Sequence, residues 1–230
     1  MIFAGIQKSS LVDYPGLVSC VLFAPGCNFD CFYCHNRQLF DGPHEVLSNT
    51  AILEFLEKRV GLLDAVVVTG GEPTLQPDLS ETLQRIGELG FRVKLDTNGA
   101  HPEIVAALLR EKRFDFCAVD YKAPAERYRE ICGPAADAAK VRETIRILAK
   151  SGVDFEIRTT VIPQLKQEDL LQMARELPSV PRWSLNRYRA PEHYKPCDES
   201  RIRETPYTQG QVDAFAREMA RIQPGMVLHE

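Results

Sequence analysis

Hydrophobic and polar residues follow two alternating patterns along this chain. Short apolar runs rich in β-branched residues are typical of strands. They lie at 17–23, 65–69, 91–97, 114–120, 153–162 and 182–188. Between them, segments with apolar residues at helical spacing lie at 49–60, 79–89, 102–112, 137–150, 167–177 and 209–222. The pattern predicts strands and helices in alternation, and we expect a seventh strand in the final residues 226–230.

Polar residues at two predicted helix starts support these boundaries. Asp78 with Glu81, and Thr208 with Gln211, have the spacing of a capping box. In a capping box, each side chain forms a hydrogen bond with the backbone N–H of the other residue. We therefore expect helices to begin directly after Asp78 and Thr208.

Strands that alternate with helices predict the α/β class, with mostly parallel strands and right-handed crossovers. The periodicity fits an open sheet and a barrel equally well. In both layouts, functional loops lie at the carboxyl ends of the strands. We expect a single domain over residues 1–230, with a core at about 15–190 and a C-terminal extension at 191–230. The longest irregular stretch is expected at 189–206.

Composition narrows the classes of partner. The chain has 230 residues, of which 44% are hydrophobic, so it can bury a sizeable core. Its formal charge of -4, with no run of Lys and Arg, gives no footprint for a phosphate backbone, and we expect no nucleic-acid partner. No stretch approaches the ~18 apolar residues of a membrane span, and the amino terminus lacks the pattern of a signal peptide. We expect a soluble, cytoplasmic protein without a membrane partner.

Three of the seven cysteines lie close together directly after the first predicted strand. Cys27, Cys31 and Cys34 form a C-x3-C-x2-C group, which indicates metal binding. A structural zinc ion normally has four ligands, whereas a centre that performs chemistry keeps one position open. Three thiolates on a four-iron cluster leave one iron free. The alternative is a zinc site with His35 as fourth ligand, although adjacent residues seldom reach one tetrahedral ion.

The other four cysteines are scattered along the chain. Cys20 and Cys117 lie within apolar runs, where a cysteine usually behaves as a small hydrophobic residue, so we expect both to be buried. Cys132 and Cys197 lie next to Gly or Pro in predicted loops, and we expect both to be surface thiols.

A second candidate site follows the strand predicted at 65–69. The sequence Gly70-Gly71-Glu72-Pro73 places two glycines and a carboxylate at the strand end. Glycine permits positive φ and close backbone approach, so a ligand amine can meet carbonyl groups and the Glu72 carboxylate there. The alternative is an ordinary turn between a strand and a helix.

Polar residues also follow three later strands. Because parallel strands end at the same edge of a sheet, these residues are expected on one side of the molecule. They are Asp96, Thr97, Asn98, Asp120, Lys122 and Arg158. The alternatives are a simple turn at Asn98-Gly99 and a solvated charge at Lys122.

The cysteine loop, with Tyr33 before its last cysteine, and the Gly-Gly-Glu-Pro turn together resemble the radical S-adenosylmethionine (SAM) superfamily. The resemblance implies that Cys27, Cys31 and Cys34 bind a 4Fe-4S cluster and that SAM chelates the fourth iron. It further implies that Tyr33 lies near the adenine and that residues 70–73 hold the amino group of SAM.

The segment Leu-Val-Asp-Tyr-Pro-Gly at 11–16 and the triplet Cys34-His35-Asn36 narrow the resemblance to activating enzymes of glycyl radical proteins. These include the activating enzymes of pyruvate formate-lyase and of anaerobic ribonucleotide reductase. The resemblance runs from about Gly5 to about Tyr188. It implies a partial (β/α)6 barrel that is open on one side for a protein substrate.

This narrower resemblance also implies roles at the strand ends. Asp96, Thr97 and Asp120 match positions that hold a monovalent cation beside the cofactor, and Arg158 matches a contact to SAM. Asp96, Asn98 and Asp120 belong to the same expected cofactor site. Lys122 matches a position near the incoming peptide. A departure occurs at Arg189, where relatives have a histidine that touches the cofactor.

The implied reaction is that of an anaerobic oxidoreductase. Flavodoxin or ferredoxin reduces the cluster, SAM is cleaved to methionine and a 5'-deoxyadenosyl radical, and the radical takes hydrogen from a glycine of a partner glycyl radical enzyme. The cofactor carries the chemistry, and no catalytic side chain is expected beyond it. One alternative is a small-molecule radical SAM enzyme similar to 7-carboxy-7-deazaguanine synthase. Another is a nonenzymatic iron-sulfur electron carrier, although a carrier has no use for an amine-binding turn.

Overall fold

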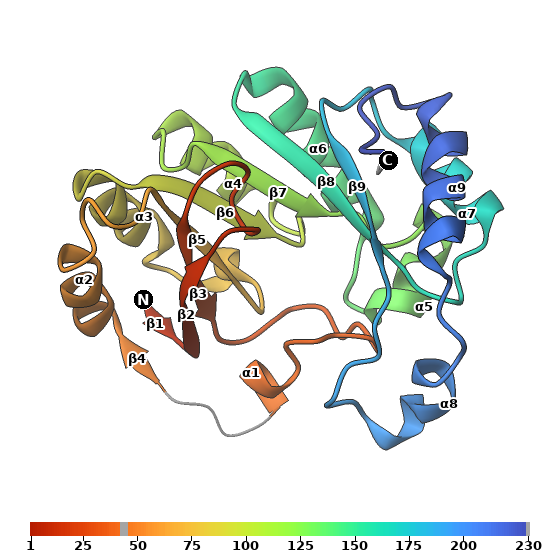
Figure 1. Ribbon diagram of the computed structural model, residues 1–230, viewed down its shortest axis with the longest axis horizontal. Helices are drawn as coiled ribbons and strands as arrows, with labels where there is room; N and C mark the ends of the chain where they lie inside the picture. The colour runs from red at the N-terminus through yellow and green to blue at the C-terminus, as the bar shows by residue number, and fades with distance from the viewer. Residues whose placement is uncertain (42–45, 229–230) are drawn as a thin grey trace. The chain divides into compact units, whose positions relative to one another are not determined.

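A computed structural model describes residues 1–41 and 46–228 of the chain (Figure 1). These residues form two compact units. The first comprises Met1–Asn28, Asn36–Thr97 and Glu103–Ala118. The second comprises Phe29–His35, Asn98–Pro102 and Val119–Glu230. The expectation of a single domain with a C-terminal extension stays a prediction.

The first unit is built on a sheet whose strands follow the order β2-β3-β5-β6. Their bounds are β2 (Gly5–Ser10), β3 (Ser19–Ala24), β5 (Ala65–Gly70) and β6 (Arg92–Thr97). β3, β5 and β6 run parallel to one another, whereas β2 is antiparallel to β3, to which the loop at residues 11–18 connects it. A separate antiparallel pair joins β1 (Ile2–Phe3) and β4 (Leu47–Ser48).

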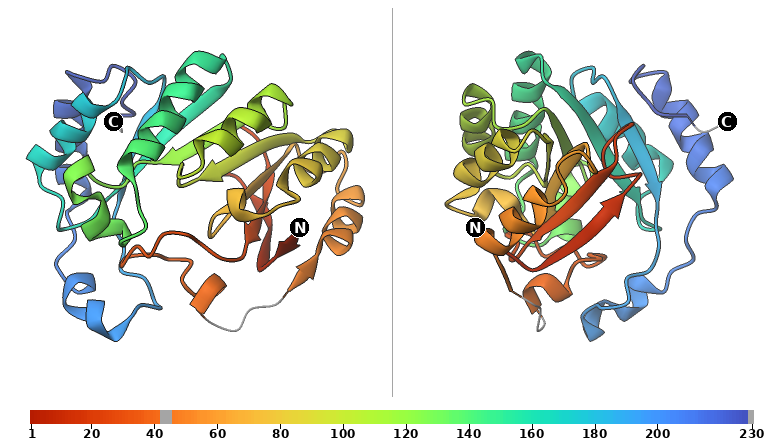
Figure 2. Two further views of the ribbon diagram at one scale, coloured as in Figure 1. Left: turned by 180° about the vertical axis from the view of Figure 1, so that it is seen from behind. Right: turned by 60° about the vertical axis from the view of Figure 1, so that its left-hand side comes forward.

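β5 is an inner strand of this sheet, and other elements cover both of its faces. Ala65, Val66, Val67 and Val68 of β5 are fully buried, as expected for a continuous apolar strand with both faces covered. The helices are α1 (Gln38–Asp41), α2 (Asn49–Glu57), α3 (Leu79–Glu88) and α4 (Pro102–Arg110), with a 3₁₀ turn η1 at Pro73–Leu75. α2 packs against α3, and α3 packs against β6 (Figure 2).

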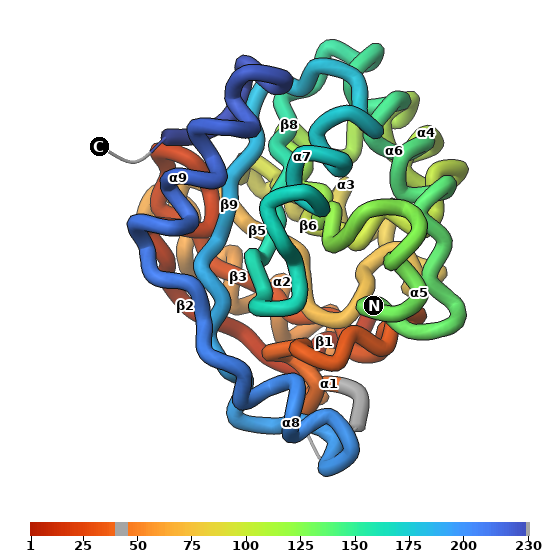
Figure 3. The backbone as a smooth tube through the Cα atoms, turned by 90° about the vertical axis from the view of Figure 1, so that its right-hand side faces the viewer, coloured from red at the N-terminus to blue at the C-terminus, as the bar shows by residue number. Residues whose placement is uncertain are grey.

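The second unit contains a parallel strand pair, β8 (Asp154–Val161) and β9 (Trp183–Arg187), in which Ile157 lies opposite Trp183. β7 (Phe116–Asp120) begins in the first unit and ends in the second. The helices are α5 (Tyr128–Cys132), α6 (Ala138–Ser151), α7 (Gln167–Glu176), α8 (Glu199–Ile202) and α9 (Gln209–Ala220). Two 3₁₀ turns, η2 (Ala125–Arg127) and η3 (Pro196–Asp198), precede α5 and α8. α9 packs against α7 and β9 (Figure 3).

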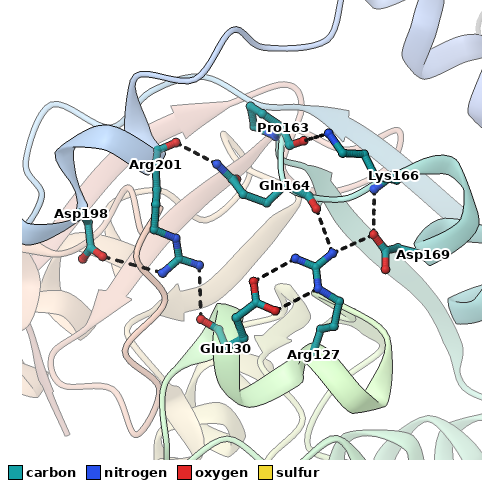
Figure 4. Close-up of polar contacts among 8 residues, drawn as sticks. All are labelled: Arg127, Glu130, Pro163, Gln164, Lys166, Asp169, Asp198 and Arg201. Atoms are coloured by element: carbon teal, nitrogen blue, oxygen red, sulfur yellow. Dashed lines mark hydrogen bonds and ion pairs between the residues drawn. The ribbon is translucent and has the colours of Figure 1, made fainter.

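A polar network in the second unit joins α5, the loop after β8, and α8 (Figure 4). Arg127 donates to both carboxylate oxygens of Glu130, each at 2.9 Å, to the Gln164 carbonyl at 2.9 Å and to Asp169 Oδ2 at 2.8 Å. Gln164 Nε2 in turn donates to the Arg201 carbonyl at 2.9 Å, and Arg201 Nη2 donates to the Glu130 carbonyl at 3.3 Å. Because each guanidinium binds several oxygens, these polar contacts fix the short elements in addition to the burial of Ile131 and Ile202.

The expected α/β class and the mostly parallel arrangement are confirmed, and all six strands and six helices predicted between residues 17 and 222 are present. The strands β1, β2 and β4 and the helices α1, α5 and α8 were not predicted. All except β2 span too few residues to show a period, and the six residues of β2 include a single large apolar side chain, Ile6. The expected irregular stretch 189–206 contains η3 and α8.

Two local predictions are wrong. The expected seventh strand is reduced to one bridge between Met226 and Trp183, and its last two residues, 229 and 230, lie outside the described residues. The capping box at Thr208 is confirmed, but Asp78 forms no side-chain cap. The backbone of Asp78, with φ -101° and ψ 20°, is not in the extended conformation that an N-cap requires.

No helix in residues 1–41 or 46–228 combines the length and the apolar composition needed to cross a bilayer.

Candidate functional site

In the first unit, the start of the cysteine loop is hydrogen bonded to the turn that follows β5. Gly71 N donates to the Ala24 carbonyl at 2.9 Å, and Glu72 N donates to the Gly26 carbonyl at 2.8 Å. Ala24 ends β3, and Gly26 directly precedes Cys27. The two candidate motifs, which are more than thirty residues apart in the sequence, therefore meet through their backbones.

The two glycines of this turn are required by that close approach. A Cβ atom at Gly71 would lie 1.8 Å from the Gly26 carbonyl oxygen. Gly70 has φ +124°, and a Cβ there would lie 2.3 Å from the Ala24 nitrogen. The sequence analysis expected these glycines to make room for a ligand amine. In the structure, they make room for the backbone of the cysteine loop.

Asn36 adds a side-chain contact between the same two segments. Its Nδ2 donates to the Gly70 carbonyl at 3.0 Å. Asn36 entered the sequence analysis only as part of the triplet after Cys34, and its contact was missed. A polar residue two positions after the last cysteine was the available signal.

Glu72 is fully buried, and one of its carboxylate oxygens accepts three hydrogen bonds. Oε1 accepts from Thr74 N at 3.1 Å, from Thr74 Oγ1 at 2.6 Å and from Thr97 Oγ1 at 2.7 Å. Thr97 ends β6, so two strand ends of the first unit supply this cluster. Thr74 was missed by sequence reasoning, and Thr97 was expected at a cation.

Asp96 lies beside a lysine that sequence reasoning also missed. Lys94 Nζ is 3.4 Å from Asp96 Oδ1, and the two side chains are 2% and 7% exposed. Residues two apart on a strand point to the same face, so Lys94 and Asp96 share one face of β6. A lysine at this spacing within an apolar run was the signal for a buried ion pair.

In the second unit, Cys31 and Cys34 lie in one tight turn, in which Cys34 N donates to the Cys31 carbonyl at 3.1 Å. The Cys31 thiol is hydrogen bonded to the Cys132 thiol, and this contact lowers the pKa of Cys31. Asp30 N donates to the Cys132 carbonyl at 2.9 Å. The prediction that Cys132 is a surface thiol is therefore wrong, because the end of α5 packs against the cysteine loop.

The remaining cysteines behave as expected. Cys20 and Cys117 are buried, and Cys197 is exposed. Burial raises the pKa of Cys20 to about 12, which keeps this thiol protonated and unreactive at neutral pH.

Aromatic and charged side chains pack around the cysteine turn of the second unit. The buried Tyr33 ring packs edge-on against Tyr188, with centroids 6.5 Å apart. The Arg201 guanidinium lies 3.8 Å from the centre of the Phe32 ring. Lys195 forms a 2.5 Å ion pair with Asp30. The segment after β9 thus makes several contacts with the cysteine loop, whereas Arg189 itself is exposed.

Tyr33 has the features of a residue that faces a polar ligand. Among the described residues, its buried hydroxyl has no hydrogen-bond partner. Burial raises the pKa of Tyr33 well above its usual value, so the hydroxyl stays protonated. A buried hydroxyl without a partner is costly, which makes it a candidate donor to a bound molecule.

Asp120, Lys122 and Arg158 form a charged cluster in the second unit. Lys122 Nζ donates to Asp120 Oδ2, and Arg158 Nε donates to Asp120 Oδ1, both at 3.0 Å. Burial acts to raise the pKa of Asp120, but the two cations outweigh burial and hold the pKa well below its usual value. Lys122 and Asp120 also act electrostatically on Cys31, so the cluster belongs to the surroundings of the cysteine turn.

Asn98 occupies the turn that was the simpler explanation for its sequence. Its Oδ1 accepts from Ala100 N at 2.9 Å, and Gly99 follows with φ +76°. The turn is confirmed, and cofactor contact by Asn98 stays a prediction.

The chain is similar to proteins of known family. Residues 21–177 match the family model described as the radical SAM superfamily. A Methanocaldococcus jannaschii protein, provisionally named a glycyl-radical enzyme activating enzyme, is 32% identical over 197 residues, which cover 83% of this chain and 81% of that protein. A second provisionally named activating enzyme from the same organism is 33% identical over 158 residues, which cover 66% of this chain and 59% of that protein.

Among solved structures, Streptococcus suis SuiB bound to its precursor peptide SuiA has a TM-score of 0.66 at 14% identity. The match covers 91% of this chain and 48% of SuiB, so the chain spans about half of that structure. SuiB has also been solved with SAM, and that structure has a TM-score of 0.62. At such low identity, the likeness shows the fold alone.

We expect Gly71→Ala to prevent the cysteine loop from docking, because its methyl group would overlap the Gly26 carbonyl. The free energy of unfolding should fall by several kcal/mol, as for other severe backbone clashes. Gly87→Ala is the matched control, because Gly87 lies within α3 with open space around it. That variant should be slightly more stable, by up to ~1 kcal/mol. Thermal unfolding of both apo-proteins measures the difference, and equal stability would contradict the close approach.

Proposed function

This chain belongs to the radical SAM superfamily, and from that premise we propose that it installs a glycyl radical on a larger partner enzyme. The observation that carries the radical SAM chemistry is the backbone contact between Gly26 and Glu72, which ties the cysteine loop to the Gly-Gly-Glu-Pro turn. The choice of a glycyl radical partner rests on the similarity to the two Methanocaldococcus jannaschii proteins.

We assign Cys27, Cys31 and Cys34 to a 4Fe-4S cluster. The donor chemistry fits, because iron-sulfur clusters are held by cysteine thiolates, and the shared loop keeps the three residues within a short stretch of chain. The family match favours this cluster over zinc. When bound, the reduced cluster and SAM supply the 5'-deoxyadenosyl radical. Flavodoxin or ferredoxin is the proposed electron donor.

Glu72 is the proposed partner of the SAM amino group, with Gly70, Gly71 and Pro73 shaping the turn around it. A fully buried carboxylate is stabilised by an opposite charge, and a ligand ammonium group provides one. The three hydrogen bonds from Thr74 and Thr97 fix the carboxylate before the ligand arrives. Glu72 therefore binds and orients the cofactor without transferring a proton.

The charged cluster of the second unit has a proposed role in binding as well. Arg158 and Asp120 are assigned to SAM. Asn98, which directly follows β6, is assigned to the same molecule, and Tyr33 is assigned to its adenine. Lys122 is assigned to the incoming glycine-containing peptide. The short contacts that Lys122 and Arg158 make with Asp120 support a prearranged polar surface.

Replacing Cys31 with Ala should abolish cluster assembly and SAM cleavage, because a site with three thiolates has none to spare. Cys27→Ala and Cys34→Ala should have the same effect. The control is Cys197→Ala, which removes an exposed thiol. Iron content and 5'-deoxyadenosine are measured after anaerobic reconstitution and reduction. Full iron and full product in any of the three variants would exclude that cysteine as a ligand.

Glu72→Gln should leave iron content intact and weaken SAM binding. Loss of a charge-assisted hydrogen bond costs about 1.5–3 kcal/mol, which corresponds to roughly 10- to 100-fold in affinity. Calorimetric titration of the reconstituted protein with SAM measures the change. Glu88→Gln, an exposed change on α3, serves as the control. Unchanged affinity in Glu72→Gln would remove this residue from the cofactor site.

The glycyl radical step is tested with glycyl radical enzymes from the source organism. After incubation with the reduced, SAM-loaded protein, the true partner should show the electron paramagnetic resonance doublet of a glycyl radical. Labelling the partner with glycine deuterated at Cα should collapse the doublet. If every such enzyme stays silent while a small molecule consumes the radical, the small-molecule alternative replaces this proposal.

A further inference from the structure

The acidic residues expected to hold a monovalent cation are already paired with cationic side chains of this chain. Asp96 has Lys94 beside it in the first unit, and Asp120 has Lys122 and Arg158 beside it in the second. The ion pair at Asp96 lies within the first unit, and those at Asp120 lie within the second. The residues present therefore do not fit a site that depends on an added cation.

The position of the Lys94 ammonium group is fixed by contacts besides Asp96. Its Nζ donates to the Asp13 carbonyl at 2.6 Å and lies 5.5 Å from the centre of the Phe116 ring. A hydrogen bond and a ring face are typical surroundings of a buried ammonium group. Lys94 is thus held in place as a fixed positive charge within β6.

The loop between β2 and β3 supplies the carbonyl group that accepts the hydrogen bond from Lys94. Ser10 Oγ donates to the Asp13 carboxylate at 2.5 Å, which shapes the loop so that the Asp13 carbonyl meets Lys94. Tyr14 packs against Phe116, with ring centroids 5.8 Å apart. The segment at 11–16, which carried part of the family resemblance, thus contacts Lys94 through Asp13 and Phe116 through Tyr14.

Electrostatics disfavours a further cation at Asp96. A metal ion bound to this carboxylate would lie a few ångströms from the Lys94 ammonium, and like charges at such a distance repel strongly where water is excluded. At Asp120, one oxygen accepts from Lys122 and the other from Arg158. The two carboxylates thus face three cations of the chain itself.

We propose that Lys94 takes the place of the monovalent cation at Asp96, so that this protein binds SAM without sodium or potassium. The inference rests on the proposed function, because it concerns the surroundings of the proposed cofactor site. Lys94 is a positioning residue: it balances the charge of Asp96 and joins β6 to the loop between β2 and β3.

The test compares the wild-type protein with Lys94→Met in sodium, potassium and N-methyl-D-glucamine chloride at equal ionic strength. The wild-type affinity for SAM should be the same in all three salts. Methionine has a similar length without the charge, so a small cation can enter beside Asp96. We expect the affinity of Lys94→Met to be weak in N-methyl-D-glucamine and to recover by about tenfold or more in sodium or potassium. Lys8→Met, a change at an exposed strand position, should behave as wild type.

Thermal unfolding of the apo-proteins gives a second readout that requires neither cluster nor SAM. The melting temperature of Lys94→Met should rise with sodium or potassium relative to N-methyl-D-glucamine, whereas wild type should not respond. If Lys94→Met does not fold, the double variant Lys94→Met with Asp96→Asn, which removes both charges, replaces it. This variant should fold and show no cation dependence.

The outcomes separate the inference from the proposed function. A wild-type protein that needs sodium or potassium for SAM binding overturns the inference, and so does a folded Lys94→Met variant that shows no rescue. A cation response in the double variant also overturns it, because the ion would then bind without Asp96. Absence of 5'-deoxyadenosine from the fully loaded wild type instead contradicts the proposed function and leaves the melting test intact.

Discussion

The backbone contact between Gly26 and Glu72 is the constraint on which the first unit depends. It requires two strands, β3 and β5, to end side by side and two glycines to replace larger residues at the crossing. Once it forms, Cys27 follows directly from one partner and the buried Glu72 carboxylate from the other. The proposed cluster ligand and the proposed partner of the SAM amino group are thereby placed by one hydrogen-bonded crossing rather than by two independent loops.

Charge balance is the second organising feature, and the chain achieves it mainly with its own side chains. Lys94 lies beside Asp96 on β6, and Asp120 at the end of β7 lies between Lys122 and Arg158. A buried carboxylate is costly unless it is paired, so each pairing stabilises an ionised group at a strand end. The same pairings prearrange a polar surface, because the groups are already oriented before a ligand binds.

The second unit depends on contacts between short elements. Cys132 at the end of α5 touches Cys31, and Arg201 of α8 stacks on Phe32. Arg127 and Glu130 join α5 to the loop after β8 and to α8. The segment that follows β9 is therefore part of the support of the cysteine turn in this unit, and α5 contributes a further thiol to its surroundings.

The sequence alone determined the features that depend on residues close together in the chain. The strand β5, the capping box at Thr208 and the spacing of Cys27, Cys31 and Cys34 could be predicted, because an apolar run or a fixed interval carries each signal. The tertiary structure decided which distant residues meet. Lys94 reaches the carbonyl of Asp13, 81 positions away, and Asn36 reaches that of Gly70, 34 positions away. Cys132, predicted at the surface, is buried against Cys31. No interval in the sequence specifies such pairs, because they form only when folding brings separate strand ends and helix ends together.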